Sequence, residues 1–194
     1  VMDKISMLID QLVNVMVSFG PLGGFLLVLL ESVVPPLPLG AIVGLNMLSF
    51  GNVFGFLISY IATIIGCIVS FYLFRYLFKD KFIHWFSKSK QETIKKWMDK
   101  LSNIDFNVLV VLFALPVTPA FAVNIAGGLS DISARKYLIA LLIGKPAMLL
   151  FYGYIAVSFV DSLKDPINFV KVGVLVLVAY IISKIVEKIV KVEE

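Results

Sequence analysis

The sequence has few of the residues on which enzyme and metal sites are built. Its 194 residues include one cysteine, Cys67, and one histidine, His84. A disulfide framework is therefore excluded, and no metal-ligand cluster, P-loop or dinucleotide-binding motif occurs. A Ser-His-Asp triad would depend on His84, which lies outside the apolar segments. We expect a protein that is not an enzyme, has no catalytic residue and needs no metal or cofactor, with Cys67 as a small buried apolar residue.

Charge is also scarce. Only 15% of the residues are charged and 60% are hydrophobic, which lies far outside the usual composition of soluble domains. The chain from Ser32 to Phe74 carries no charge at all. Because a helix needs about 20 apolar residues to cross a bilayer core, this run is too long for one crossing. The length and composition predict a single integral membrane domain over residues 1–194.

Prolines interrupt two of the apolar segments near their middle. They are Pro35, Pro36 and Pro38 in the first segment and Pro116 and Pro119 in the second. Proline removes a backbone donor and clashes with the preceding turn, so neither segment can be one straight helix. About 10 helical residues reach the bilayer midplane from one side. We therefore expect two re-entrant helical hairpins, whose irregular backbone must be surrounded by protein or water.

The predicted fold is all-α, with two inverted re-entrant hairpins, about three transmembrane helices and amphipathic interfacial helices. Full spans are expected over 53–74 and 137–160, and a final transmembrane helix over 167–190. An interfacial helix is expected over 3–18. Segment 82–101 has an apolar stripe beside several lysines, which is typical of a helix on the membrane surface. The alternative for this segment is an ordinary connecting helix.

Two parts of the chain, about 19–78 and 106–160, resemble each other. Each has a Pro-x-x-Pro break, then a Leu-Ser pair, then a long span with a central glycine. The matching residues are Pro35, Pro38, Leu48, Ser49 and Gly66 in the first part and Pro116, Pro119, Leu129, Ser130 and Gly144 in the second. If each part is a hairpin followed by one crossing, the second part starts from the opposite side, which gives an inverted repeat. The shared residues are few, so chance similarity is the alternative.

The distribution of the basic residues gives an independent test of the topology. With both broken segments as hairpins, loop 75–105, turn 131–136 and the C-terminus share one side, which then carries most of the 17 basic residues. The positive-inside rule makes that side cytoplasmic. A single crossing by 106–130 would instead move Arg135 and Lys136 to the other side. We expect the plasma membrane of a prokaryote, with 75–105 and the C-terminus facing the cytoplasm.

The breaks also place candidate functional groups inside the membrane. Helix starts near Leu39 and Ala120 would present unpaired N–H groups, which attract anions. Lys145 adds a positive charge in mid-span, and Glu31 lies beside the first break. Charged residues at this depth are costly and usually functional. The predicted transport path consists of Glu31, Lys145, Thr118, Asn46, Asn124 and Tyr152.

Each of these assignments has a structural alternative. Glu31 and Lys145 could neutralise each other and fasten the two halves. Asn46 and Asn124 could cap turns or join helices by hydrogen bonds. We interpret a further set of residues as sites of close helix packing. They are Gly66, Gly127, Gly128, Gly144 and Pro146.

These motifs resemble the DedA/VTT superfamily, the SNARE-associated Golgi protein group. The residues that carry the resemblance are Glu31-x-x-x-Pro35-x-x-Pro38, Pro116-x-x-Pro119 with Asn124, Gly127-Gly128-Leu129-Ser130 and Gly144-x-Pro146. The resemblance covers about residues 20–160 and implies two facing re-entrant hairpins. It also implies movement of lipids across the bilayer. Two departures argue against strict proton coupling: Phe113 and Pro119 stand where relatives carry arginines, and 39–41 lacks the acidic residue of the DedA branch.

The resulting hypothesis is transbilayer lipid transport through a polar groove between the hairpins. The chain would act as a scramblase or flippase of anionic phospholipids or polyprenyl-phosphate carriers. The alternatives are a proton- or ion-coupled small-solute transporter and a membrane scaffold that transports nothing. Membrane lipids are the expected partners, and a homo-oligomer is an open alternative. Nucleic acid is not expected, because the tryptophan and phenylalanine residues of 82–101 suit lipid better.

Overall fold

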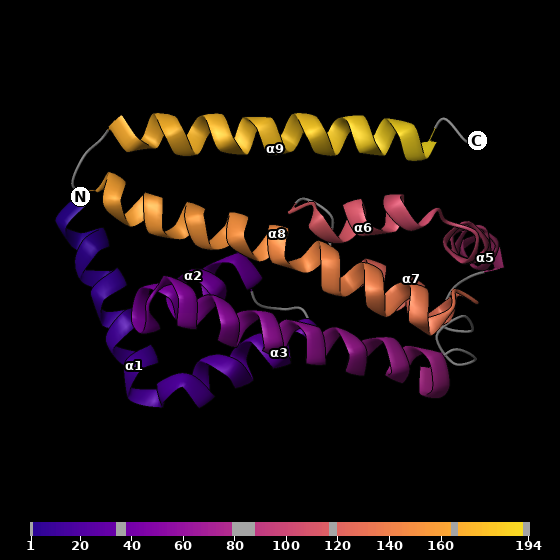
Figure 1. Cartoon of the computed structure of the whole chain (residues 1–194), viewed down its shortest axis with the longest axis horizontal. Coiled ribbons are helices and arrows are strands. Elements are labelled where there is room, and N and C mark those ends of the chain that lie inside the picture. Colours follow the sequence, from indigo (N-terminus) through magenta and orange to yellow (C-terminus); the bar gives the residue numbers. More distant parts are fainter. Residues whose placement is uncertain (1, 34–37, 79–87, 117–119, 164–166, 192–194) are drawn as a thin grey trace.

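Every element in the described part of the chain is helical (Figure 1). The computed structural model describes all residues except 1, 34–37, 79–87, 117–119, 164–166 and 192–194. The elements are α1 (Met2–Val33), α2 (Leu39–Phe50), α3 (Asn52–Leu73), the π-helical turn η1 (Phe74–Phe78), α5 (Lys88–Ser102), α6 (Phe106–Ala114), α7 (Ala120–Leu129), α8 (Ala134–Ser162) and α9 (Ile167–Lys191). The all-α class predicted from the sequence is confirmed for these residues.

Among the residues that the structure describes, three helical stretches are long and apolar enough to cross a membrane. They are Lys4–Val33, Asn52–Phe78 and Ala134–Ser162. The last two contain the spans predicted over 53–74 and 137–160. The chain is therefore an integral membrane protein by the length and composition of its helices.

The sequence predicted a final transmembrane helix over 167–190. α9 covers Ile167–Lys191 with 25 residues, so its bounds agree with that range. Within the residues searched for spans, its apolar part is Phe169–Ile182. That α9 crosses the membrane stays a prediction.

The first helix is bent rather than straight. Gly20 has φ 67° and ψ −177°, which is not a helical conformation, and Pro21 follows it. Glycine reaches a positive φ without steric cost. Figure 1 shows the two arms of α1 at an angle to each other. Lys4–Val33 therefore satisfies the length of a span only as two arms, and the sequence correctly placed the end of the first arm at Gly20.

Three helices are too short to cross a membrane alone. α2, α6 and α7 have 12, 9 and 10 residues. At a rise of 1.5 Å per residue they measure about 14–18 Å, roughly half of a 30 Å hydrocarbon core. α6 begins at Asp105, whose Oδ1 accepts hydrogen bonds from the backbone N–H groups of Asn107 and Val108. It ends at Ala114, because Pro116 cannot continue the helix.

The second short helix of each half also packs on the long helix of the other half, which we call exchanged packing. α1 packs on α3, and α6 packs on α8, so the first short segment of each half contacts the long helix of its own half. α2 packs on α8 as well as on α3, and α7 packs on α3. The second short helix of each half thus contacts the long helix of the other half. This arrangement holds the two halves together.

Two glycines make corresponding close contacts in the two halves. A Cβ atom added to Gly66 of α3 would lie 2.5 Å from the Cβ of Ser32. A Cβ added to Gly144 of α8 would lie 2.6 Å from the Cβ of Phe113 and 2.5 Å from the Val110 carbonyl oxygen. Ser32 and Phe113 each precede the first proline of their break by three residues. The backbones therefore approach closely at equivalent places, where only glycine fits.

A buried aromatic group lies where α3, α6 and α8 meet. The rings of Phe71 and Tyr137 stack with centroids 4.1 Å apart, and the ring of Phe113 meets Tyr137 edge-on at 5.2 Å. All three side chains are at most 1% exposed. Such pairs stabilise beyond their buried area. This cluster fixes the start of α8 against α3 and α6.

We predict that Gly144→Ala lowers thermal stability, because the new methyl group would collide with backbone and Cβ atoms of α6. Overpacking of this kind costs about 1–3 kcal/mol. Gly173→Ala in α9 is the matched control, since nothing lies within 4 Å of a Cβ at that position. Thermal unfolding of both variants in detergent, followed by circular dichroism, tests this. Equal melting temperatures for the two variants would contradict the close packing at Gly144.

Candidate functional site

A small pocket lies where the two halves meet. It is lined by Glu31, Ser32, Leu39, Thr63, Cys67, Asn124 and Lys145. These residues come from the second arm of α1, the start of α2, the middle of α3, α7 and the middle of α8. The pocket has about 210 Å³ of free space, including space open to solvent. The exchanged packing of the short helices therefore brings polar groups of both halves to one place.

Lys145 is the central charge of this pocket. Its side chain is fully buried, at 0% exposure. Its ammonium group donates to the Met148 Sδ atom at 3.4 Å and lies 5.8 Å from the centroid of the Phe113 ring. A thioether is a weak acceptor, and an ammonium group has three donors. Since a buried charge is costly without a strong partner, the pocket favours an anion beside Lys145.

Glu31 faces the same pocket from α1. The sequence analysis considered that Glu31 and Lys145 could form an ion pair. Both residues are described, and no nitrogen–oxygen contact within 4 Å joins them. The two charges therefore lie on the same pocket without direct contact.

Thr63 is a lining residue that the sequence did not single out. Its side chain is fully buried, and its Oγ1 atom has no hydrogen-bond partner among the described residues. A threonine in a helix often bonds the carbonyl oxygen one turn earlier, but Thr63 does not. A buried hydroxyl without a partner costs about 1–3 kcal/mol. A ligand that hydrogen-bonds this hydroxyl would remove that cost.

Asn124 is fixed in the pocket wall by two hydrogen bonds. The Tyr137 hydroxyl donates to Asn124 Oδ1 at 2.7 Å, and Asn124 Nδ2 donates to the Cys67 Sγ atom at 3.2 Å. Asn124 and Cys67 are each 1% exposed. This chain joins α8, α7 and α3. The sequence correctly suggested a buried Cys67, but it gave no sign that the thiol lines the pocket.

Tyr152 connects the two breaks. Its hydroxyl donates to the Pro116 carbonyl oxygen at 2.6 Å, at the end of α6. Its ring lies beside Gly40, where an added Cβ atom would lie 3.1 Å from the ring. Tyr152 therefore contacts the start of α2 and the end of α6, although it does not line the pocket itself.

Asn46 was predicted as a path residue, but the structure places it outside the pocket. It is fully buried, and its Nδ2 atom donates to the Gly24 carbonyl oxygen at 3.3 Å and to Ser59 Oγ at 3.0 Å. These bonds join α1, α2 and α3. The alternative considered for this amide, a hydrogen-bonded link between helices, describes its geometry.

The remaining predicted residues occupy helix contacts or lie outside the described part. An added Cβ would lie 2.9 Å from the Tyr137 ring at Gly127 and 2.6 Å from the Phe71 carbonyl oxygen at Gly128. Pro146 lies inside α8, and Pro38 precedes α2 without a side-chain cap. Four predicted residues lie outside the described residues: Pro35, Pro36, Thr118 and Pro119.

Arg75 has a role that the sequence analysis missed. It lies in η1, and its Nη2 atom donates to the carbonyl oxygens of Gly127, Ser130 and Ile132 at 3.3, 2.8 and 2.7 Å. Its guanidinium carbon lies 4.3 Å from the centroid of the Phe71 ring. The sequence used Arg75 only as a charge on the cytoplasmic side. The structure shows that it holds the open end of α7, since the last carbonyl groups of a helix have no partner within it.

Comparisons with known proteins place the chain among membrane proteins. The family model of the VTT domain matches residues 34–158. The uncharacterized membrane protein YhjE of Bacillus subtilis is 30% identical over 171 residues, which cover 88% of this chain and 82% of YhjE. The uncharacterized protein YqeD of the same organism is 30% identical over 129 residues, 66% of this chain and 60% of YqeD. No solved structure matches the chain.

We predict that Arg75→Gln destabilises the fold, because the three carbonyl groups at the end of α7 lose their charged donor. Hydrogen bonds to a charged group contribute about 1.5–3 kcal/mol. Arg135→Gln is the control, since Arg135 is exposed at the start of α8. Thermal unfolding in detergent should show a lower melting temperature for Arg75→Gln alone. A similar decrease for both variants would mean that loss of charge, and not loss of the helix cap, is responsible.

Proposed function

This chain belongs to the VTT domain family, the DedA/SNARE-associated group, and we propose that it moves lipids across the bilayer. The proposed substrates are phosphate-bearing lipids: anionic phospholipids or polyprenyl-phosphate carriers. The observation that carries the proposal is the buried Lys145 ammonium, whose hydrogen bond is to a thioether, facing a pocket that also contains the unpartnered Thr63 hydroxyl. Together these groups suit a phosphate.

We further propose that the short helices form two re-entrant hairpins. The second arm of α1 would pair with α2, and α6 with α7. Their lengths of about half a membrane and the prolines between them support this. Glu31 and Leu39, at the inner ends of the first pair, meet Asn124 and Lys145 of the second half in one pocket. The site would then lie near the bilayer midplane, as in other proteins with inverted repeats.

The start of α2 adds to the attraction for phosphate. The first N–H groups of a helix have no partner within it, and Pro38 provides no side-chain cap. Leu39, the first residue of α2, lines the pocket. A phosphate between Lys145, Thr63 and the start of α2 would thus meet a positive charge, a hydroxyl and the positive end of a helix dipole.

The acyl chains would stay in the bilayer while the headgroup crosses. The outer surface of the bundle carries many exposed large apolar side chains, among them Leu22, Val53 and Ile143. Because such a surface suits hydrocarbon, only the headgroup needs the polar interior. Glu31 lies across the pocket from Lys145 and would limit the negative charge that the site holds. The cytoplasmic side would be the end that carries α5 and the C-terminus, where basic residues gather.

A second candidate is transport of a small solute or ion. In this state the pocket offers about 10 Å³ to a water-sized molecule, which is room for about one water. It would have to widen to hold a headgroup, and a small ion would need less widening. A scaffold without transport would instead need Lys145 only for stability.

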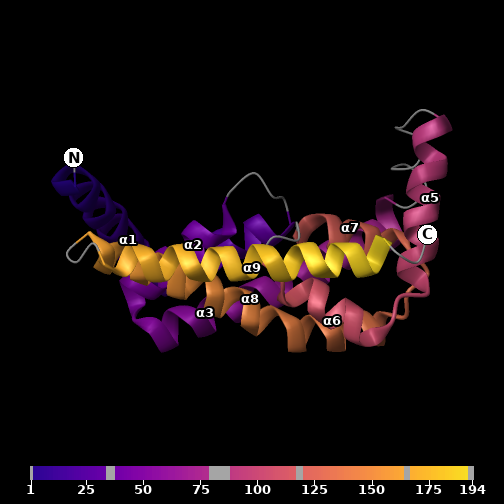
Figure 2. The same cartoon turned by 90° about the horizontal axis from the view of Figure 1, so that it is seen from above.

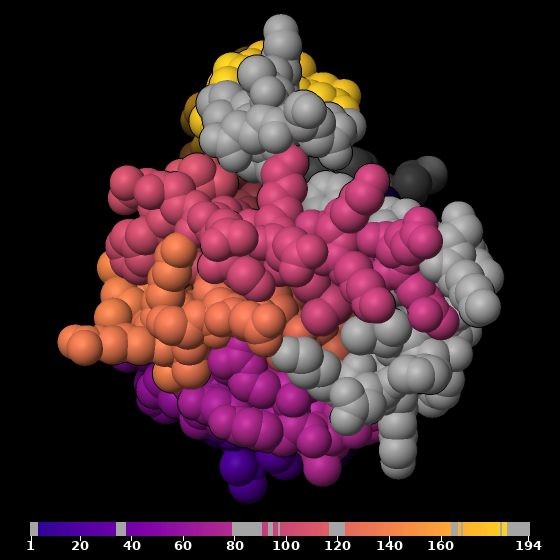
Figure 3. All heavy atoms as spheres, turned by 90° about the vertical axis from the view of Figure 1, so that its right-hand side faces the viewer, coloured from indigo at the N-terminus to yellow at the C-terminus, as the bar shows by residue number. Residues whose placement is uncertain are grey.

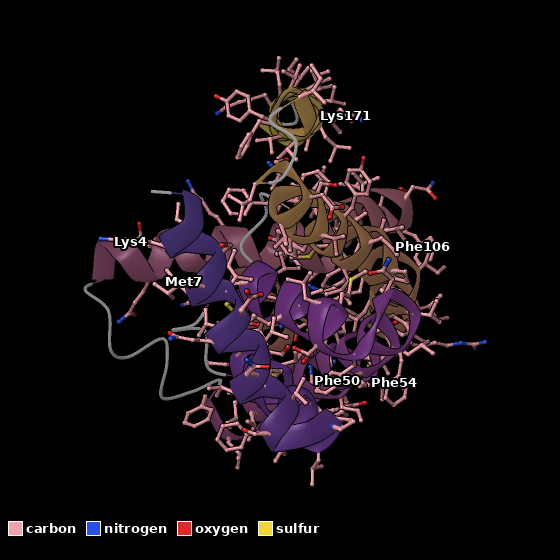
Figure 4. All side chains as sticks on the ribbon, turned by 90° about the vertical axis from the view of Figure 1, so that its left-hand side faces the viewer. Lys4, Met7, Phe50, Phe54, Phe106 and Lys171 are labelled. Atoms are coloured by element: carbon pink, nitrogen blue, oxygen red, sulfur yellow. The ribbon has the colours of Figure 1, made fainter. Side chains whose placement is uncertain are left out.

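We predict that Lys145→Met slows transbilayer movement of headgroup-labelled anionic lipids by about ten- to a hundredfold, as expected for loss of a charged hydrogen bond of about 1.5–3 kcal/mol. The measurement is dithionite quenching in liposomes that contain the purified protein. Lys171→Met is the matched control, because it removes the same charge from an exposed position on α9, at the edge of the bundle beside α8 (Figure 4).

The outcomes separate the candidates. Quenching well beyond the outer leaflet for wild type and Lys171→Met, but not for a folded Lys145→Met, supports transport through the pocket. Quenching that stops at about half in all samples excludes passive scrambling of the lipids tested. The next measurements would then be the transbilayer movement of a polyprenyl phosphate and, after that, the flux of a small solute. If Lys145→Met and Glu31→Gln change the melting temperature and leave the flux intact, the charged pair has a structural role only.

A further inference from the structure

Helix α5 lies across one end of the bundle. Figure 1 shows it end-on, and Figure 2 shows it running crosswise to the long helices α3, α8 and α9. Figure 3 shows this end of the molecule, where α5 lies exposed. If α3 and α8 cross the membrane, α5 lies parallel to the membrane surface. This orientation suits a helix that rests at the level of the lipid headgroups.

The charge of α5 complements an anionic surface. The helix has five lysines and two acidic residues, which gives a net charge of +3. They are Lys88, Lys90, Lys95, Lys96, Lys100, Glu92 and Asp99. Lys95 and Lys96 are exposed. Lysines near an anionic leaflet are attracted to it, and this attraction weakens as salt is added.

The end of α5 is hydrogen-bonded to the second half of the bundle. The backbone N–H of Asp131 donates to Ser102 Oγ at 2.9 Å, and Ser102 Oγ donates to the Met98 carbonyl oxygen at 2.9 Å. The Lys136 ammonium donates to the Ile104 carbonyl oxygen. Asp131 lies two residues after the end of α7, and α5 also packs on α7. A displacement of α5 therefore pulls on α7.

α7 in turn forms part of the pocket. It carries Asn124, which lines the pocket and donates to the Cys67 Sγ atom of α3. A continuous path of contacts thus runs from the exposed lysines of α5 through Ser102 and α7 to the pocket. Each step of this path is a packing contact or a hydrogen bond between described residues.

We propose that α5 binds the anionic lipid surface at its end of the protein and, through Ser102 and α7, controls access to the pocket. Anionic lipid in that leaflet draws α5 to the surface, shifts α7 and opens the pocket. The regulation of transport rests on the proposed function. The binding by α5 and the opening of the pocket do not, and they are tested without transport.

The first experiment measures binding of α5 to lipid. The two tryptophans of the chain, Trp85 and Trp97, both lie in 82–101, so intrinsic fluorescence reports on this segment alone. In the full-length protein in phosphatidylcholine liposomes, brominated lipids should quench this emission more strongly when phosphatidylglycerol is added. High salt should reverse the change.

The variant Lys95→Gln with Lys96→Gln should lose most of the phosphatidylglycerol response. The matched control, Glu92→Gln with Asp99→Asn, changes two neighbouring charges of the same helix and should keep or strengthen it. Tryptophan quenching that is the same in both kinds of liposome would overturn the proposal. It would then favour a soluble acidic partner or a simple connecting helix for α5.

The second experiment measures opening of the pocket. Cys67 is the one cysteine of the chain and lines the pocket, so its alkylation by N-ethylmaleimide reports access. Alkylation should be several-fold faster in liposomes with phosphatidylglycerol than in phosphatidylcholine alone. Equal rates would overturn the coupling between α5 and the pocket.

Ser102 provides the test of the connection. Ser102→Ala should keep the tryptophan response and lose the lipid dependence of Cys67 alkylation, and Ser102→Thr, which keeps a hydroxyl, should restore it. If Ser102→Ala retains the lipid dependence, the proposed connection is wrong. If wild type shows both lipid responses but moves no lipid, the proposed function fails while the role of α5 stands.

Discussion

The structure depends on how broken helices are completed where water is scarce. A helix that ends inside an apolar bundle leaves carbonyl groups without partners, and each such group is costly in lipid. Here the partners come from side chains of the long segments. Tyr152 donates to the carbonyl group of Pro116 between the two halves, and Arg75 donates to three carbonyl groups at and after the end of α7, at the end of the bundle that carries α5. Short helices can therefore end within the bundle, and the polar starts of others become available to a ligand.

The same breaks determine how the two halves are joined. Because α2 packs on α8 and α7 packs on α3, neither half buries its apolar surface alone. The close helix contacts at Gly66 and Gly144 occupy equivalent places in the two halves. The pocket lies where the two halves meet. Its lining is asymmetric, because Glu31 and Thr63 come from the first half and Asn124 and Lys145 from the second. A change in the contact between the halves would therefore change the pocket directly.

Much of this could be predicted from local pattern, and the rest depends on tertiary contacts. Uncharged runs and prolines predicted the membrane class and the breaks, because hydrophobicity and proline act locally. Charge in mid-span identified Glu31 and Lys145, which do share the pocket. Thr63 and Cys67 carry no charge and stand in no motif, so only the packing of α3 reveals them. The cap formed by Arg75 depends on residues more than fifty positions away. The hydrogen bonds of Asn46 to Gly24 and Ser59 likewise depend on the packing of α1, α2 and α3, and no local pattern shows them.

The position of the buried positive charge explains why the pocket suits an anion. The Lys145 ammonium group lies over the ring of Phe113, 5.8 Å from its centroid. An aromatic ring attracts a cation but accepts no strong hydrogen bond. A direct ion pair with Glu31 would have satisfied Lys145 and closed the site, whereas a thioether and a ring leave the ammonium group in need of an acceptor. The packing of the core around Phe71, Phe113 and Tyr137 offsets the desolvation cost of this charge, and an entering phosphate would lower that cost. Binding of a phosphate would thus stabilise the protein.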